Sequence, residues 1–235
     1  MALVKLTTIL FDAGGTLVFP NFQRIVDELG PDGVGLDLAR LAQADADVRR
    51  GLDDPAIIAA TNDGQRFSRY LHLLAQAVGL PDIPPPVMQR LQAYHDEQNL
   101  WEQVPPDVVP ALELLRKRFR MGVVSNANGT VRQKLRRIGL ADFFETIVDS
   151  HEEGIEKPDP RLFEVALSRM NVRAEDTAYV GDLYFVDVIG ARAAGLRPFL
   201  LDPYGLYAGL HSGTHPQPAV AHIRGLADLA VVAAD

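Results

Sequence analysis

The hydrophobic pattern of the chain alternates between short apolar runs and amphipathic stretches. The first run, Lys5–Phe11, contains several β-branched residues and ends abruptly at Asp12. A bounded run of this kind predicts a buried strand that enters a tight loop. Four further strands are predicted at Met121–Val124, Thr146–Asp149, Thr177–Val180 and Pro198–Leu201.

Helices are predicted between these strands. The four segments are Asp107–Phe119, Thr130–Ile138, Pro160–Met170 and Val186–Ala194. Aspartate is a favourable N-cap and proline suits the first helical turn, which supports the start of two of these helices. Strands that alternate with helices indicate an α/β fold in which a parallel sheet is covered on both faces. Such sheets bind ligands at the carboxyl ends of their strands, where the strand order switches.

The segment from Asn21 to about Gln103 has a different pattern. Apolar residues recur three or four positions apart, as in Phe67, Tyr70 and Leu74. This spacing is typical of amphipathic helices, and we expect a helical unit without a strand. Between Pro20 and Val104 there are 13 acidic residues, seven arginines and no lysine, so most of the net negative charge lies in this insert.

Composition narrows the class of protein. The 235 residues are 47% apolar and 23% charged, as in an ordinary folded domain, and the net charge is −8. Phosphate-rich partners need a basic face, so this balance argues against binding to nucleic acid or to an anionic membrane. The chain has no cysteine, which excludes disulfides, thiolate metal sites and a cysteine nucleophile.

Nothing in the sequence suggests a membrane span or a signal peptide. No apolar run approaches the roughly 18 residues that a membrane-spanning helix needs. The apolar stretch Leu6–Phe11 near the amino terminus is short and leads directly into Asp12 and two glycines. We therefore expect a cytoplasmic protein with no nucleic acid and no membrane among its partners.

Polar residues follow the predicted strands where each apolar run ends. They are Asp12, Gly14, Gly15 and Thr16 in the first loop, Ser125 and Asn126 in the second, Lys157 further on, and Asp182 and Asp187 after the fourth strand. Carboxylates that converge at strand ends suit a hard cation such as Mg²⁺, which prefers oxygen ligands. A lysine and a hydroxyl–amide pair complete a cradle for phosphoryl oxygens, and glycine lets the backbone approach them closely.

These motifs resemble those of the haloacid dehalogenase superfamily in order and spacing. They are Asp12-Ala13-Gly14-Gly15-Thr16-Leu17, Ser125-Asn126, Lys157-Pro158, and Gly181-Asp182 with Asp187 five residues later. The resemblance implies a Rossmann-like core, formed by residues 1–19 and 105–235, and a helical cap, formed by residues 20–104. It also implies a Mg²⁺ cofactor and a nucleophilic aspartate that forms a covalent phosphoryl intermediate.

The resemblance also assigns a role to each motif residue. Asp12 would be the nucleophile and a metal ligand, and Lys157 would offset the charge on Asp12 and on the phosphate. Ser125, with Asn126, would hold the transferring phosphoryl group, and Gly15 and Thr16 would contact the substrate. The remaining metal ligands would be the Gly14 backbone carbonyl, Asp182 and, as a ligand or as support, Asp187.

Gly14 departs from the pattern of the family's phosphatases. Those enzymes have a second aspartate at this position, which protonates the leaving group and then activates water. A glycine cannot do this, and the loss of general acid catalysis typically costs about 10²- to 10⁴-fold. Three alternatives follow: substrates with good leaving groups, a substitute carboxylate from the cap, or a weak or vestigial enzyme.

Two other branches of the family also lack that aspartate. The phosphonate-cleaving branch uses a cap lysine, and the lysines of this chain, at positions 5, 117, 134 and 157, all lie outside the cap. The 2-haloacid dehalogenases need no metal and commonly lack the aspartate found here at Asp182, but halide leaves without a proton and Arg24 could hold a substrate carboxylate.

The sequence therefore predicts a Mg²⁺-dependent hydrolase of small phosphorylated metabolites that forms an aspartyl phosphate on Asp12. A 2-haloacid dehalogenase and a non-catalytic member of the family remain as alternatives.

Overall fold

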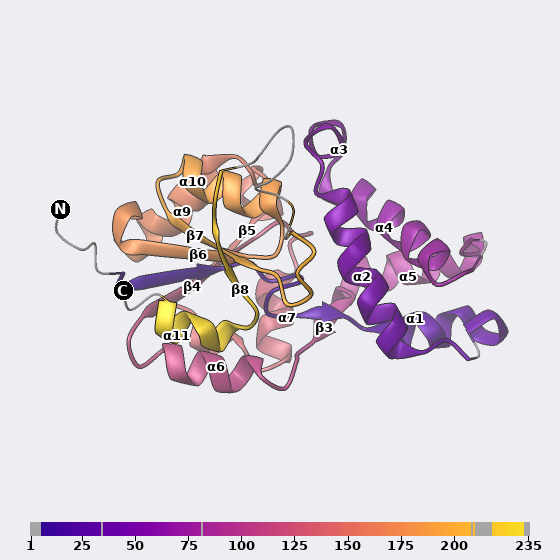
Figure 1. The fold of residues 1–235 in the computed structure, drawn as a ribbon. Helices are drawn as coiled ribbons and strands as arrows, with labels where there is room; N and C mark the ends of the chain where they lie inside the picture. The colour runs from indigo at the N-terminus through magenta and orange to yellow at the C-terminus, as the bar shows by residue number, and fades with distance from the viewer. Residues whose placement is uncertain (1–5, 34, 81, 208, 210–217, 233–235) are drawn as a thin grey trace.

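The computed structural model describes residues 6–33, 35–80, 82–207, 209 and 218–232. A six-stranded sheet forms the larger part of the molecule, in the order β5-β4-β1-β6-β7-β8 (Figure 1). Every neighbouring pair is parallel, which confirms the predicted α/β fold. The strands are β1 (Thr8–Phe11), β4 (Arg120–Ser125), β5 (Thr146–Asp149), β6 (Thr177–Gly181), β7 (Arg197–Leu201) and β8 (Ala221–Ile223).

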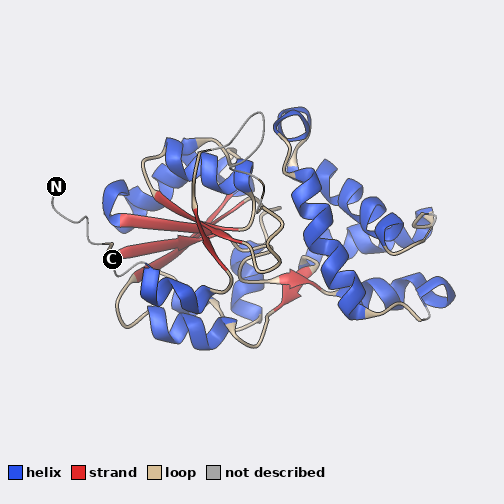
Figure 2. Ribbon diagram, in the orientation of Figure 1, coloured by secondary structure: helices blue, strands red, loops and turns tan. Residues whose placement is uncertain are grey.

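Helices cover both faces of this sheet (Figure 2). They are α6 (Val108–Leu115), α7 (Val131–Arg137), α8 (Ser150–Glu153), α9 (Pro160–Met170), α10 (Gly190–Ala193) and α11 (Leu229–Val232). Successive residues of β1 point to opposite faces. Ile9 and Phe11 therefore pack in the cluster that contains residues of α6, α7 and α11, whereas Leu10 packs in the cluster of α9 and α10.

The strand order reverses direction at β1. From this central strand the chain first builds β4 and β5 on one side and then β6, β7 and β8 on the other. The loops that leave β1, β4 and β6 therefore open at the same edge, at the switch point where such sheets bind ligands.

The segment between the first and second core strands forms a separate helical layer, drawn in indigo to magenta in Figure 1. It contains α1 (Phe22–Leu29), α2 (Leu38–Leu52), α3 (Pro55–Ala60), α4 (Asp63–Ala77) and α5 (Pro85–Gln98). Its apolar side chains, among them Leu71 and Leu91, form a cluster of their own. We call this segment the cap; its division from the core at residues 20 and 104 stays a prediction.

A short two-stranded ribbon connects the cap to the core, which corrects the expectation of an insert without strands. β2 (Phe19–Pro20) pairs antiparallel with β3 (Trp101–Gln103). These strands are only two and three residues long, too short for a periodic pattern to mark them. The ribbon places Trp101 next to Gly14, in the loop that follows β1.

Other differences concern the ends of elements. The helix predicted to reach Phe119 ends at Leu115, and the Asp107 side chain makes no capping hydrogen bond. The helix predicted from Val186 begins as a π-helical segment, Tyr184–Ile189, ahead of α10. The strand β8 was not predicted. The first residue of the predicted strand Lys5–Phe11 lies outside the described residues.

No helix among the described residues combines the length and the apolar character that crossing a membrane requires.

Candidate active site

Four loops at the carboxyl ends of the strands supply the polar groups of the site. Asp12 directly follows β1, Ser125 ends β4, and Asp182 follows the last residue of β6. Lys157 lies beyond α8, after β5. The Asp12 backbone N–H donates to the Val180 carbonyl at 2.8 Å, so the β1 loop is fixed to the strand that precedes Asp182.

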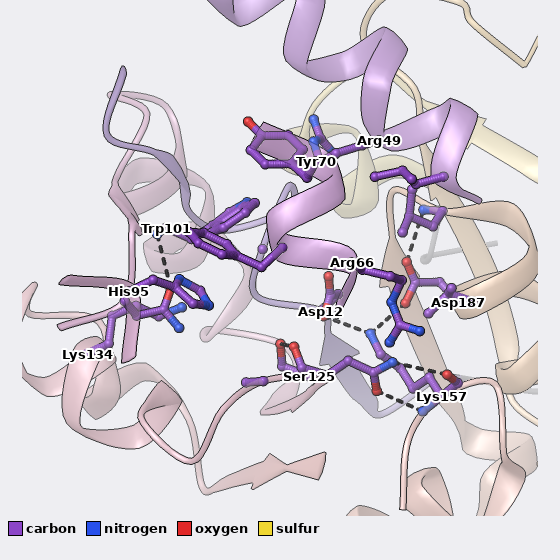
Figure 3. A pocket seen from close by; sticks show the side chains of 18 residues that line it. Asp12, Arg49, Arg66, Tyr70, His95, Trp101, Ser125, Lys134, Lys157 and Asp187 are labelled. Atoms are coloured by element: carbon purple, nitrogen blue, oxygen red, sulfur yellow. Dashed lines mark hydrogen bonds and ion pairs between the residues drawn. The ribbon is translucent and has the colours of Figure 1, made fainter. Parts of the chain in front are cut away.

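Lys157 is the centre of a buried ion network. Its Nζ lies 2.7 Å from Asp12 Oδ1, 2.7 Å from Asp187 Oδ1 and 2.8 Å from the Tyr179 hydroxyl (Figure 3). The three donor positions of an ammonium group are thus all used. Asp187 also accepts hydrogen bonds from Tyr179 OH at 3.0 Å and, through Oδ2, from the Leu183 N–H at 3.0 Å. The network fixes Lys157 against the predicted nucleophile.

Burial and charge shift the ionisation of this network. Burial raises the pKa of Asp12, and the charge of Lys157 opposes that rise. Burial alone lowers the pKa of Lys157, but the charges of Asp12 and Asp187 outweigh it and raise the pKa above its usual value. Lys157 is therefore a permanent cation at neutral pH, as a group that stabilises phosphoryl charge must be.

Three carboxylates in the site could hold a metal ion. One oxygen from each of Asp12, Asp182 and Asp187 lies within 4.8 Å of the others. Asp182 Oδ1 is buried and has no hydrogen-bond partner, a costly state for a carboxylate oxygen unless a cation or donor meets it. The donors are all hard oxygen atoms, which fit Mg²⁺ better than a softer metal.

An arginine of the cap reaches into this group. Arg49, on α2, forms an ion pair with Asp182 Oδ2. Asp45 holds the arginine from behind, with Arg49 Nε donating to Asp45 Oδ2 at 3.0 Å, and the Tyr70 hydroxyl donates to Asp45 Oδ1 at 2.8 Å. The cap therefore presents a positioned guanidinium to a predicted metal ligand.

A second cap residue docks on the core beside that ion pair. Asp53, just after α2, accepts hydrogen bonds from the N–H groups of Phe185 and Val186 at 3.0 and 3.1 Å, and from the Tyr207 hydroxyl at 3.0 Å. Phe185 and Val186 belong to the π-helical segment that carries Asp187. Arg49 and Asp53 thus hold the cap closed over the Asp182–Asp187 loop.

The two residues of the motif at the end of β4, Ser125 and Asn126, make different contacts. Ser125 is 3% exposed and lines the cavity, as expected for a group that meets the phosphoryl oxygens. The Asn126 side chain is engaged by the main chain of Lys157: it accepts from the Lys157 N–H at 2.7 Å and donates to the Lys157 carbonyl at 3.0 Å. Asn126 therefore fixes the position of Lys157.

The turn that follows β1 requires a glycine at position 15. Gly15 has a φ of +81°, and a Cβ at this position would lie 2.7 Å from both carboxylate oxygens of Asp182. No side chain fits there, so the turn requires glycine. The next residue, Thr16, is 1% exposed, and its hydroxyl is buried without a hydrogen-bond partner.

Trp101 occupies the space above Gly14. A Cβ on Gly14 would meet Trp101 Cδ1 at 3.3 Å. The indole belongs to a group of rings in which it contacts Phe67, Tyr70 and His95, with ring centroids 5.1 to 6.0 Å apart. An aromatic wall therefore stands close to the position where the family's phosphatases carry an aspartate.

One cavity joins the catalytic loops to the cap. It measures about 160 Å³, close to the roughly 150 Å³ of an engineered apolar cavity that holds one benzene molecule. Asp12 and Lys157 lie at one end and His95 and Lys134 at the other, with Trp101 between them (Figure 3). A substrate of a few carbon atoms fits this space.

Arg24, which the sequence suggested as a group near the first motif that could hold a substrate carboxylate, is not among the described residues that line this cavity. Its guanidinium lies over the Tyr94 ring, 3.9 Å from the centroid, and pairs with Glu28 at 3.3 Å. α1 begins at Phe22, so Arg24 belongs to the first turn of a helix whose buried residues, Ile25 and Leu29, face the cap's own core. Proximity in sequence to Asp12 was misleading here.

Most of the cavity wall beyond the motif residues was not predicted from the sequence. The cap supplies Arg49, Arg66, His95 and Trp101, and the core helix α7 supplies Lys134. One signal was present for Lys134. It lies between Val131 and Leu135 on the buried face of a helix, where a lysine is unusual.

Comparisons with known proteins agree with this geometry. Residues 6–195 match the model of the haloacid dehalogenase-like hydrolase family. A glyceraldehyde 3-phosphate phosphatase of Methanopyrus kandleri is 36% identical over 135 residues, which cover 57% of this chain and 58% of the relative. A phosphoserine phosphatase of Thermus thermophilus is 35% identical over 134 residues, which cover 57% of this chain and 53% of that one. The chain thus spans a little over half the length of these curated relatives.

Solved structures match nearly the whole chain. The HAD-hydrolase YfnB of Bacillus subtilis, in a crystal form bound to magnesium, has a TM-score of 0.68 at 22% identity, with 96% of this chain and 97% of that chain covered. A 2-haloacid dehalogenase of Pseudomonas syringae has a TM-score of 0.57 at 27% identity, with 95% and 96% covered. Motifs, fold and family model agree, and the chain belongs to the haloacid dehalogenase-like hydrolases.

Proposed function

We propose that the protein is a Mg²⁺-dependent phosphatase of small phosphorylated metabolites and that Asp12 is its nucleophile. The observation that carries the proposal is the buried network in which Lys157 holds Asp12 and Asp187 at 2.7 Å each, beside the unpartnered oxygen of Asp182. A buried carboxylate, a fixed cation and a set of hard oxygen atoms at one end of one cavity support these roles.

The reaction has two steps. Lys157 binds Asp12 Oδ1, which leaves Oδ2 to attack phosphorus in line with the leaving group. The bond between phosphorus and the leaving-group oxygen breaks, and that oxygen departs with the electron pair. Water then attacks phosphorus of the aspartyl phosphate, the bond to Asp12 breaks, and the carboxylate is restored.

The surrounding groups stabilise phosphoryl charge. Lys157 is a cation that needs no reorientation during the reaction, and the hydroxyl of Ser125, which also lines the cavity, would donate to a phosphoryl oxygen. Mg²⁺, held by Asp12, Asp182 and the backbone carbonyl of Gly14, would supply further charge neutralisation, with Asp187 as support. The closed cap excludes water around the leaving group.

Among the described cap residues that line the cavity, none is a carboxylate that could replace the acid missing at Gly14. His95 is part of the aromatic wall, and burial lowers its pKa to about 4. At neutral pH it is uncharged and cannot serve as the acid. Acyl, aryl and anhydride phosphates, whose leaving groups need little protonation, are therefore expected to turn over faster than alkyl phosphates, whose hydrolysis the missing acid slows but does not prevent.

Relatives support phosphate hydrolysis. The curated relatives include proteins named glyceraldehyde 3-phosphate phosphatase and phosphoserine phosphatase, names that specify small phosphorylated substrates. Dehalogenation is the second candidate, favoured by one observation: Arg49 already places a cation on Asp182, so part of the charge of this carboxylate is balanced without metal.

The experiment is phosphate release from a panel of phosphorylated metabolites and an aryl phosphate, with Mg²⁺ and with a chelator. Asp12→Asn is expected to abolish release and to leave the melting temperature nearly unchanged, because the amide still accepts a hydrogen bond from Lys157. Asp107→Asn, at an exposed position without a capping bond, is the matched control. Release retained in Asp12→Asn would refute the mechanism, and halide release that survives the chelator would favour the dehalogenase.

A further inference from the structure

The end of the cavity opposite Asp12 is built around a buried lysine. Lys134 is 3% exposed and lies on α7, a helix of the core, with its side chain in the cavity wall. Figure 3 shows it beside His95 and across the cavity from Lys157. A positive charge in the cavity wall acts more strongly on a bound ligand than one in bulk water, because the effective dielectric constant is lower there.

The histidine beside it is a hydrogen-bond donor toward the same space. His95 Nδ1 accepts from the Leu100 N–H at 3.3 Å, so the neutral ring carries its proton on Nε2. Burial lowers the pKa of His95 to about 4, and the charge of Lys134 adds to that effect. The ring stacks on Phe67, with 3.9 Å between the centroids, which fixes its orientation. An ammonium group and an N–H donor therefore share this end of the cavity.

Negative charge on the cavity wall is confined to the catalytic end. Among the described residues that line the cavity, the acidic ones are Asp12 and Asp187, and both are bound to Lys157. The cap adds Arg66 to the wall at the catalytic end, beside Asp187 and Lys157, where it pairs with Glu156 at 2.7 Å (Figure 3). A ligand that reaches from Asp12 to Lys134 thus meets the ammonium group of Lys134 and the N–H of His95 at its far end.

We propose that the Lys134–His95 end of the cavity binds a carboxylate on the leaving group, so that the substrate is a phosphorylated short-chain hydroxy acid. This inference rests on the proposed phosphatase function and names its substrate class. The cavity of about 160 Å³ limits the organic part to a few carbon atoms. An amino group near the carboxylate is disfavoured, because Lys134 repels an ammonium and no carboxylate among the lining residues at this end receives it.

The test is calorimetric titration of the Asp12→Asn protein with three phosphate esters of matched length, in the presence of Mg²⁺. 3-Phosphoglycerate carries the carboxylate, glycerol 3-phosphate lacks it, and phosphoserine adds an ammonium group. We expect 3-phosphoglycerate to bind at least tenfold more tightly than each of the other two. Binding does not require turnover, so this test is independent of whether Asp12 is the nucleophile.

Variants at position 134 identify the group responsible. In the Asp12→Asn background, Lys134→Met is expected to abolish the preference for 3-phosphoglycerate, whereas Lys134→Arg keeps most of it. Lys117→Met, which removes an exposed lysine, is the matched control and keeps the preference. Melting curves of all variants show whether they fold.

Three results would overturn the inference: equal binding of 3-phosphoglycerate and glycerol 3-phosphate, a preference that survives Lys134→Met, and no binding of any of the three esters. If the carboxylate preference is found but the wild-type protein releases no phosphate from any substrate, the proposed function fails and the carboxylate site stands.

Discussion

The two ends of the cavity are built in different ways. At the core end, charged groups are paired within the loops of one sheet, with Lys157 between Asp12 and Asp187. At the cap end, Trp101, His95 and Lys134 come from the ribbon, the cap and a core helix, and aromatic contacts hold the first two. In our proposal the first arrangement performs the chemistry at phosphorus, and the second selects the group that is attached to the phosphate.

Gly14 and Trp101 lie where the two ends meet. The family's acid is missing at Gly14, and Trp101 fills the adjoining space. The apolar wall of the cap therefore lies against the loop after β1, at the position where an acid would aid catalysis. We therefore expect that an acid introduced at position 14 restores protonation of the leaving group and does not change which leaving groups the cap end of the cavity binds.

Gly14→Asp is expected to have the largest effect of the changes that follow. An aspartate supplies the missing proton, so kcat/KM for an alkyl phosphate should rise by about 10²-fold over Gly14→Asn, while an aryl phosphate gains much less. The added Cβ would lie 3.3 Å from Trp101 Cδ1, so the indole must shift by a few tenths of an ångström. The same comparison in a Trp101→Leu background removes that obstacle. Equal gains for alkyl and aryl phosphates would mean that protonation does not limit the reaction.

A second prediction concerns the ionisation of the cap end. The pKa of His95 is about 4 in the fold against a usual 6.5, so between these values the unfolded chain binds a proton that the folded chain does not. Stability therefore falls as the pH drops through this window, by about 3 kcal/mol more in the wild type than in His95→Gln. Urea unfolding followed by Trp101 fluorescence at pH 7, 5 and 4 measures the difference.

The pH dependence that Asp53 contributes to stability has the opposite sign. Burial raises its pKa to about 6, so stability from this group falls as the pH rises through the range between 3.8 and 6. The contribution is present in both proteins and cancels in the difference between wild type and His95→Gln. A difference that stays constant from pH 7 to pH 4 would show that His95 is not the buried neutral group described here.

The smallest expected effect is on the metal requirement. Arg49 pairs with Asp182, so the cap's cation competes with a metal ion for one carboxylate oxygen. Arg49→Gln should lower the Mg²⁺ concentration for half-maximal aryl phosphate hydrolysis by roughly 5- to 10-fold, the lower part of the usual range for coupled ligands. Arg50→Gln, one residue along the helix, removes the same charge as a control. An unchanged or higher Mg²⁺ requirement in Arg49→Gln would show that the arginine does not compete.

Much of the core could be predicted from sequence because its signals are local. The runs at Thr146–Asp149 and Pro160–Met170 coincide with β5 and α9, and the ends of the strands place Asp12 and Asp182 at one edge of the sheet. Each of these features depends on a few consecutive residues. The rule that crossover connections are right-handed limits the possible strand orders but does not select the observed one.

Apart from Lys134, the residues of the cap end could not be predicted, because nothing local distinguishes them. Arg24, Arg49 and Arg50 are similar in sequence context, and only the packing of α2 turns Arg49 toward Asp182. Trp101 lines the site because it lies on the three-residue strand β3, which pairs with β2. The whole cap separates these two strands along the sequence. Contacts over such separations arise from tertiary packing, which a single sequence does not reveal.

The central claim is that Asp12 carries the phosphoryl group during turnover. The most direct measurement is to mix the protein with an aryl phosphate and Mg²⁺, quench in acid within one turnover, and determine the mass of the peptide that contains Asp12. If Asp12 is the nucleophile, this peptide gains one phosphoryl group, and the same peptide of the Asp12→Asn protein gains none. Phosphate release with no phosphoryl group on this peptide, or equal labelling in the Asp12→Asn protein, would contradict it.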